Sequence, residues 1–223
     1  MTDSAGRWFP PDPPASPRRL RKHALAAQLR ALIGDVLMLD VEVLTEPQLA
    51  EVEHRLAAAR QALSGLPNVR AVGLHHAGDD SSLFERSPLS GRSNALAAPL
   101  VLEFDGDLTR GHATYGEVYE GPPGLVHGGY VISAFDDLLG VAQAASGVAG
   151  LTGTIEVKLR RGTPLHQRID YEAGVLEQKG RKILTWGRST LDGELLVEAT
   201  GVFITPPHGH PAKALMDQAR TRP

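Results

Sequence analysis

Helical periodicity marks the first part of the chain. Apolar residues recur at helical spacing from about Arg18 to Leu39, at Leu25, Leu29, Leu32, Ile33, Val36 and Leu37. A second helix is expected after Thr45, because Thr45 and Gln48 fit a capping box and Gly65 stands where a helix would end. One face of this second helix collects Leu49, Val52, Leu56, Ala59 and Leu63. We interpret the two helices as a packing or assembly module.

A period of two replaces the helical period after about residue 90. The segments "APLVLEFDG" and "HATYGEVYE" are expected to be strands, and a helix of roughly Gly129 to Ser146 follows them. Next, "TIEVKLR" alternates apolar and charged residues, which is typical of a half-buried strand. Short turns at Lys179–Gly180 and Asp192–Gly193 then connect an antiparallel meander. This order predicts an α+β fold, with one antiparallel sheet and one long helix that covers a face of it.

The same patterns divide the chain into four segments. The Pro-rich residues 1–17 are expected to form a disordered arm, and residues 18–90 a helical extension that ends in a loop. Residues 91–206 form the expected main domain, and residues 207–223 a frayed tail.

Composition narrows the chemistry. The chain has 223 residues and no cysteine, which excludes disulfides and cysteine chemistry and suits a reducing compartment, so we expect a cytoplasmic protein. A net charge of −3 argues against nucleic acid as the main partner. No stretch offers the roughly 18 apolar residues of a membrane span. Neither metal-ligand spacing nor a Walker, G-x-G-x-x-G or G-x-S-x-G motif is present, so no metal or cofactor is expected.

Two neighbouring acids interrupt the predicted helix after residue 128. Asp136 falls beside the apolar stripe, where desolvation raises the pKa of a carboxyl group and favours a catalytic role. Asp137 falls roughly opposite the stripe and is expected to face solvent or a second subunit. The alternative for Asp136 is an ordinary carboxylate at the boundary of the core. The stripe consists of Val131, Phe135, Leu138 and Ala142.

The loop before this helix has the outline of an oxyanion site. Gly128 and Gly129 stand at the helix start, where unpaired amides and the positive end of the helix dipole favour a developing negative oxygen. A Gly-Gly pair at this place is also a common requirement of a turn, and His127 alone is more often a structural histidine.

The segment "GPPGLVHGGYVISAFDDLLG" resembles the signature of hotdog-fold acyl-CoA thioesterases of the PaaI type, especially the branch of thioesterase superfamily member four. The resemblance covers about residues 95–206 and includes Thr152, "VKLRRGTPL" and "GRK". It implies a hotdog fold in which Asp136 is the catalytic carboxylate, as general base or nucleophile. Thr152 would orient water or the acid, the Gly129 amide, with Gly128, would polarise the thioester carbonyl, and His127 would hold the loop or the substrate.

The resemblance also implies a coenzyme A site and an assembly. Lys158, Arg160 and Arg181 occupy positions expected to meet the phosphates and the pantetheine end, although a solvated strand face is the alternative for each of them. Gly162 stands where such proteins often have proline. Hotdog domains generally pair edge to edge, so a homodimer or a dimer of dimers is expected, with sites between subunits.

The expected function is therefore hydrolysis of a fatty acyl-CoA to a free fatty acid and coenzyme A, within lipid metabolism. An aryl group such as phenylacetyl is the main competing acyl group. A non-catalytic acyl-CoA-binding protein, acting as a sensor or partner, is the alternative from another functional class. A hotdog dehydratase would use a different histidine and acid arrangement, which the sequence lacks.

Overall fold

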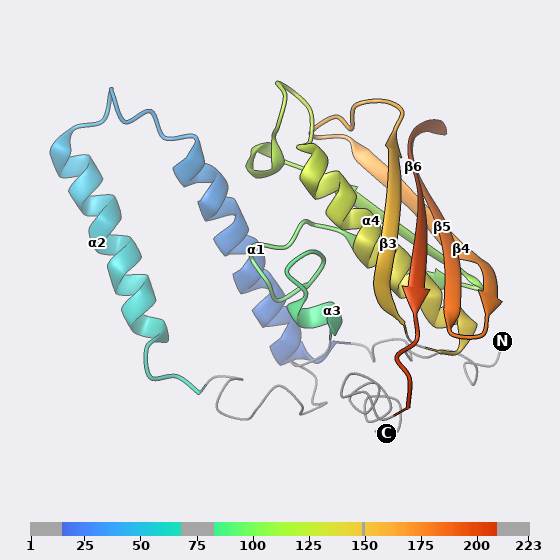
Figure 1. The fold of residues 1–223 in the computed structure, drawn as a ribbon. Helices are drawn as coiled ribbons and strands as arrows, with labels where there is room; N and C mark the ends of the chain where they lie inside the picture. Colours follow the sequence, from blue (N-terminus) through green and yellow to red (C-terminus); the bar gives the residue numbers. More distant parts are fainter. Residues whose placement is uncertain (1–14, 68–82, 149, 209–223) are drawn as a thin grey trace.

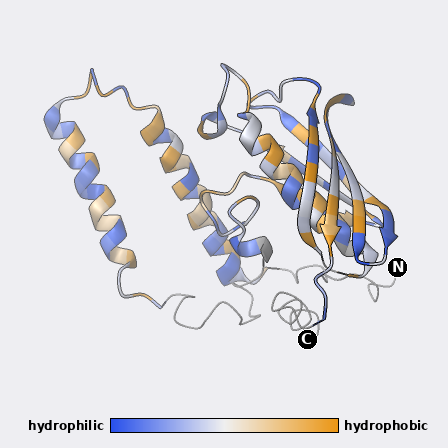
Figure 2. Ribbon diagram, viewed as in Figure 1, coloured by the Kyte–Doolittle hydropathy of each residue, from blue (hydrophilic) through white to orange (hydrophobic). Residues whose placement is uncertain are grey.

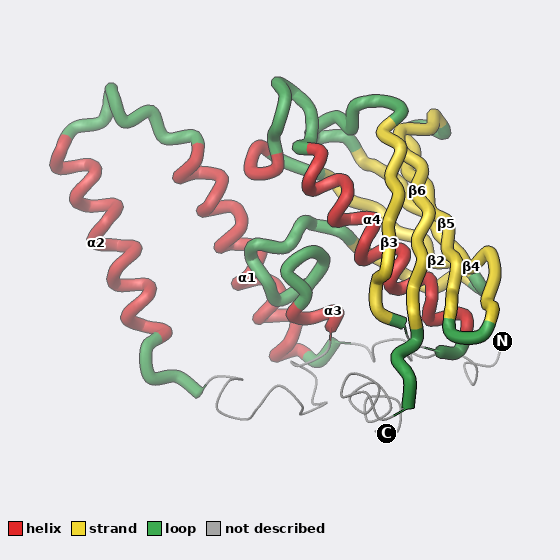
Figure 3. Tube along the Cα trace, in the orientation of Figure 1, coloured by secondary structure: helices red, strands yellow, loops and turns green. Residues whose placement is uncertain are grey.

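The computed structural model describes residues 15–67, 83–148 and 150–208. Figures 1 and 3 show two parts: a pair of long helices, and a curved sheet that encloses one helix. The predicted arm and tail fall mostly outside the described residues, as do His75, His76 and His210. The proposed domain boundaries stay predictions.

The two N-terminal helices form as expected. Helix α1 spans Pro17–Leu37, and the Ser16 hydroxyl at its N-cap accepts a hydrogen bond from the Arg19 amide over 3.2 Å. Helix α2 spans Glu46–Leu63, and the Thr45 amide donates to Oε1 of Gln48 over 2.9 Å. The predicted capping box is thereby confirmed, because the Gln48 side chain satisfies an amide that the helix start leaves unpaired.

One six-stranded antiparallel sheet forms the second part, in the order β1-β2-β4-β5-β6-β3. Strand β3 is therefore an edge strand, although it follows the central helix in sequence, and most of its residues are exposed. An exposed edge carries unpaired amides and carbonyls that another strand can bind. The strands are β1 Val101–Asp105, β2 Leu108–Thr114, β3 Leu151–Leu159, β4 Arg168–Lys179, β5 Lys182–Leu191 and β6 Glu194–Ile204.

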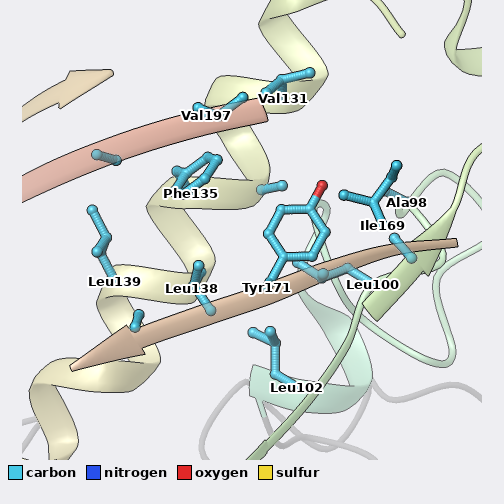
Figure 4. Close-up of a cluster of buried hydrophobic side chains, with 14 of the residues drawn as sticks. Ala98, Leu100, Leu102, Val131, Phe135, Leu138, Leu139, Ile169, Tyr171 and Val197 are labelled. Carbon is cyan, nitrogen blue, oxygen red and sulfur yellow. The ribbon is translucent and has the colours of Figure 1, made fainter. Parts of the chain in front are cut away.

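Helix α4 spans Gly128–Ala142 and packs its apolar stripe against the inner face of the sheet. Figure 4 shows Phe135, Leu138 and Leu139 pointing from this helix into the core, beside Tyr171 and Val197. Each fully buried side chain of this size contributes roughly 1.5–3 kcal/mol. This is the α+β arrangement that the order of elements predicted, with the helix wrapped by the sheet.

The helix and the sheet approach each other closely at two glycines. A Cβ atom on Gly201 would lie 3.1 Å from Cδ1 of Leu139, and one on Gly187 would lie 3.1 Å from Cδ2 of the same leucine. Contacts this short leave no room for an acyl chain between α4 and the middle strands of the sheet.

Two segments differ from the sequence prediction. "HATYGEVYE" is not one strand, because β2 ends at Thr114 and Glu117–Tyr119 is a short 3-10 helix that turns the Tyr119 ring into the core. The segment after residue 82 is more than a connecting loop. It contains helix α3, Leu83–Arg86, and it buries the Glu85 and Ser87 side chains.

Glu85 lies at the junction between α1 and the sheet domain. Both of its carboxylate oxygens contact Nε2 of His23, at 2.8 and 2.9 Å, and it also accepts a hydrogen bond from the Ser93 hydroxyl. Arg30 of α1 donates to the carbonyl oxygens of Ala97 and Asn94. These contacts fix one side of α1 to the rest of the protein.

Within the three described ranges, no helix is both long enough and apolar enough to cross a membrane.

Candidate active site

Asp136 and Thr152 lie together where α4 passes the edge strand. The Thr152 hydroxyl donates a hydrogen bond to Oδ1 of Asp136 over 3.1 Å. Asp136 is half-buried and Thr152 is exposed, so a water molecule or a substrate can reach the carboxylate. A hydroxyl group at this distance fixes the orientation of the carboxylate.

The start of α4 is built as a cap around His127. The His127 amide donates to the Tyr119 carbonyl oxygen over 2.8 Å. The Nδ1 atom of the His127 ring accepts a hydrogen bond from the Gly129 amide over 3.0 Å. Because the first amides of a helix lack intrahelical acceptors, the Gly128 amide is the one left to bind an oxyanion in this arrangement. In the structure the Gly129 amide is therefore engaged by His127, which caps the helix, and Gly128 replaces Gly129 as the candidate amide for an oxyanion.

The carboxylate and these amides are far apart within one subunit. Gly128 and Asp136 are separated by about two turns of α4, or roughly 12 Å along the helix axis. A reacting carbonyl needs both groups within about 3.5 Å of its own atoms. Within one subunit the Asp136 carboxylate and the Gly128 amide are therefore too far apart to act on one carbonyl. The ideal position of Cβ at Gly128 lies 3.7 Å from Leu159, at the far end of β3 from Thr152.

The prediction for Asp137 was wrong. Its side chain is largely covered by the segment that follows α3, and Oδ2 of Asp137 accepts hydrogen bonds from Ser87, over 2.9 Å, and from Ser90. Burial raises the pKa of Asp137, the two serine hydroxyls oppose that rise, and the nearby Asp136 charge adds to it. Asp137 is thus only partly exposed, and its carboxylate is hydrogen-bonded within the subunit. It fastens the segment to the back of α4.

The three predicted coenzyme A cations do not gather in one subunit. Lys158 lies 3.3 Å from Glu156, and Arg160 donates to Glu198 over 2.9 Å, near the Leu159 end of β3. Arg181 donates to the Thr205 carbonyl oxygen over 2.8 Å, at the other end of the sheet. The length of β3, roughly 25 Å between these ends, separates Arg181 from the other two.

Sequence reasoning missed the serine contacts of Asp137. It also missed that the predicted site residues lie near opposite ends of β3. The hydrogen-bonding capacity of "ERSPLSGRSN" was a signal for the first, since two serines there stand three residues apart. Among the described residues, no group of three or more histidines or acids could hold a metal ion.

Comparison with solved structures identifies the fold. A thioesterase superfamily protein designated RHA08564 is 28% identical, and the match covers 86% of this chain and 96% of that chain with a TM-score of 0.68. A hypothetical thioesterase from Streptococcus pneumoniae TIGR4, solved with coenzyme A, is 17% identical over 48% of this chain and 87% of that one, with a TM-score of 0.44. The protein smu.793 from Streptococcus mutans UA159, bound to acetyl CoA, is 13% identical over 48% of this chain and 88% of that one, with a TM-score of 0.46.

No family model matches the chain. The chain has the hotdog fold, and its structural neighbours are thioesterase superfamily proteins. The match to RHA08564 covers far more of the chain than the sheet domain does, so it extends into the helical part. The more specific assignment to the branch of member four stays a prediction.

Proposed function

We propose that this protein is an acyl-CoA thioesterase whose active sites form between two subunits. The observation that carries the proposal is the placement of two incomplete half-sites at opposite ends of one exposed edge strand. The similarity to RHA08564, a thioesterase superfamily protein, supports the reaction class.

Antiparallel pairing of β3 with β3 of a second copy would join the half-sites. Such pairing brings the Thr152 end of one strand to the Leu159 end of the other. The acid half, with Asp136 and Thr152, then meets the amide half, with His127 and Gly128, of the partner. Each dimer would contain two complete sites related by the two-fold axis.

The same pairing would gather the cations. Arg181 lies at the Thr152 end of β3, whereas Lys158 and Arg160 lie near the Leu159 end. In the proposed dimer these residues come from different subunits and surround one bound coenzyme A, whose phosphates they can hold by charge-assisted hydrogen bonds. The ion pairs of Lys158 and Arg160 are exposed, so exchanging them for phosphate costs little.

Asp136 acts on the thioester as a general base or as a nucleophile. As a base, it takes a proton from water while the water oxygen bonds to the carbonyl carbon, and the Gly128 amide stabilises the oxyanion. The carbon–sulfur bond then breaks, and the proton passes from the acid to the leaving thiolate. As a nucleophile, Asp136 bonds to the carbonyl carbon, the carbon–sulfur bond breaks and coenzyme A leaves as the thiolate. Water then hydrolyses the resulting anhydride, which regenerates the Asp136 carboxylate and supplies the proton that the thiolate takes up. Neither route calls for a metal or a redox cofactor.

A fatty acyl group is the proposed substrate class. The apolar groups that remain accessible beside the acid are Ile132 on α4 and Leu151 on β3, which are 45% and 47% exposed. Since the close packing at Gly187 and Gly201 closes the space beneath α4, an acyl chain would lie along this outer side of the helix, toward the partner subunit.

The test is thiol release from a panel of acyl-CoAs, from short to long chains with phenylacetyl-CoA added. Wild-type protein should release coenzyme A, and Asp136→Asn should lose at least about a hundredfold in kcat. Asp170→Asn alters an exposed acid on β4 and serves as the matched control. Full turnover by Asp136→Asn would overturn the proposal. Binding of acyl-CoA without any thiol release would make the protein a sensor or partner instead.

A further inference from the structure

Helices α1 and α2 carry apolar seams that the described part of the chain leaves largely uncovered. In α1 the seam has spacings of four, three and four residues, and in α2 of three, four, three and four, which is the spacing of coiled-coil cores. Figure 2 shows hydrophobic and hydrophilic residues alternating along both helices. The seams are Leu25, Leu29, Leu32 and Val36 in α1 and Leu49, Val52, Leu56, Ala59 and Leu63 in α2.

Exposure shows that these seams are not buried within one subunit. Leu25 and Leu29 of α1 are 56% and 47% exposed, Leu63 of α2 is 60% exposed, and no residue of α2 is buried. Because an amphipathic helix takes most of its stability from packing of its apolar face, α2 requires a partner that the described residues of this subunit do not supply.

The seam of α1 has one flank already in use. Arg19 and Ala26, which stand on one side of the seam, are buried, and Arg19 lies 3.9 Å from Glu85 of α3. The other flank is exposed and changes from basic to neutral to acidic along the helix. It consists of Arg21, Gln28 and Asp35, spaced by seven residues.

The matching flank of α2 has the opposite order of charge. It consists of Glu46, Glu53 and Arg60, also spaced by seven residues and all exposed. Charges that border a coiled-coil seam set the orientation and the choice of partner. A parallel alignment of the two helices places Arg21 beside the acidic end and Asp35 beside the basic end. An antiparallel alignment turns this flank of α1 toward the other flank of α2, Gln48, Arg55 and Ala62, which places no opposite charge beside Arg21 or Asp35.

Within one chain the two helices run antiparallel, with α2 on the side of α1 away from the sheet (Figure 1). The favourable parallel alignment therefore needs the α2 of another molecule. A two-fold axis perpendicular to the helices provides it, because α2 of the second copy then runs parallel to α1 of the first.

We propose that the hairpin formed by α1 and α2 is a self-association surface, which binds the same hairpin of a second copy in a four-helix bundle. In this bundle α1 of each copy lies parallel to α2 of its partner, and the two seams form the shared core. This surface is separate from the β3 edge and does not depend on the proposed enzymatic activity.

Disulfide trapping tests the alignment, since the full-length chain contains no cysteine. A chain with Arg21→Cys is co-expressed with a differently tagged chain with Glu46→Cys and then oxidised. The parallel bundle should give a disulfide between the two chains. The pair Arg21→Cys and Arg60→Cys is the matched control and should give much less product between chains. Equal yields from both pairs, or product from the control pair alone, would overturn the proposal.

Charge exchange provides an independent test in the trapping pair. Asp35→Arg should lower the yield of the Arg21→Cys with Glu46→Cys product several-fold, and adding Arg60→Asp should restore it. Ala27→Arg places an arginine on the opposite side of α1 and should leave the yield unchanged. Failure of Arg60→Asp to restore the product, with both variants folded by circular dichroism, would contradict the pairing of these flanks.

Discussion

Thr152 and Asp136 form the contact that connects the edge strand to the central helix, through a 3.1 Å hydrogen bond from the Thr152 hydroxyl to Oδ1 of Asp136. The neighbouring acid does not share this contact, because Asp137 accepts hydrogen bonds from Ser87 and Ser90 instead. The two adjacent acids therefore have different hydrogen-bond partners. Asp136 is half-buried beside an exposed threonine, whereas Asp137 fastens the segment after α3 to the helix.

Removing the Thr152 hydroxyl should lower turnover more than stability. Thr152→Ala loses a hydrogen bond to a charged group, worth about 1.5–3 kcal/mol when it operates in the reaction, so kcat should fall roughly 10- to 100-fold. Thr152→Ser keeps a hydroxyl and should retain most activity. Thr154→Ala changes another exposed threonine on β3 and is the control. Equal kcat values for Thr152→Ala and wild type, measured by thiol release, would remove Thr152 from the site.

Mixed dimers should recover activity if the half-sites come from different subunits. Gly128→Pro deletes the candidate amide at the first position of α4, where proline is well tolerated, and the ψ angle of 130° at His127 suits a following proline. This variant and Asp136→Asn should each be nearly inactive.

Co-expression of Gly128→Pro with Asp136→Asn should restore about a quarter of wild-type activity. About half of the dimers are then mixed, and each mixed dimer has one intact site of two. Gly128→Ala keeps the amide, its Cβ would make only ordinary contact with Leu159, and it serves as the control for the added side chain. Mixed samples no more active than the separate variants would show that acid and amide belong to the same subunit.

Local pattern predicted most of the fold. The period-two strands, the capping box at Thr45 and the stripe of α4 depend on neighbours in sequence, and each was found where it was expected except the second half of "HATYGEVYE". The burial of Asp137 depends on residues about fifty positions earlier, so the helical wheel of α4 alone indicated solvent. Arg181 was grouped with Lys158 by family resemblance, but strand order places them at opposite ends of β3.

Asp137 should make stability depend on pH. Its folded-state pKa lies above the ordinary value of 3.8, so the folded protein holds this proton more tightly than the unfolded chain does. The resulting stabilisation is complete below that ordinary value and is lost as pH rises through the raised folded value. Asp137→Asn cannot ionise, so its melting temperature should fall less than that of wild type over this range.

Asp137→Ala should behave differently, because it leaves the Ser87 and Ser90 hydroxyls without their acceptor and should cost about 1–3 kcal/mol. Asp107→Asn, at an exposed turn, is the control for loss of a carboxylate. Melting curves recorded from about pH 4 to pH 7 decide the matter. Parallel pH profiles for wild type and Asp137→Asn would contradict the assignment.

The buried Tyr115 and Tyr171 pair predicts a loss of stability at alkaline pH. Their hydroxyl oxygens lie 2.8 Å apart in the core. Burial raises the pKa of Tyr115 to about 12 and that of Tyr171 well above its usual range, because the phenolate is poorly solvated there. Both groups thus favour the folded state fully below pH 10, the ordinary tyrosine value, and that stabilisation is lost as pH rises toward 12.

Single and double replacements separate the charge effect from the hydrogen bond. Tyr171→Phe strands the Tyr115 hydroxyl and should cost about 1–3 kcal/mol at neutral pH, whereas replacing both tyrosines by phenylalanine removes donor and acceptor together and should cost less. Between about pH 10 and 12, the free energy of unfolding of the double variant, measured by urea titration, should also fall less steeply with pH than that of wild type. Tyr130→Phe, at a partly exposed ring, is the control. Additive single effects would show that the two hydroxyls do not act as a pair.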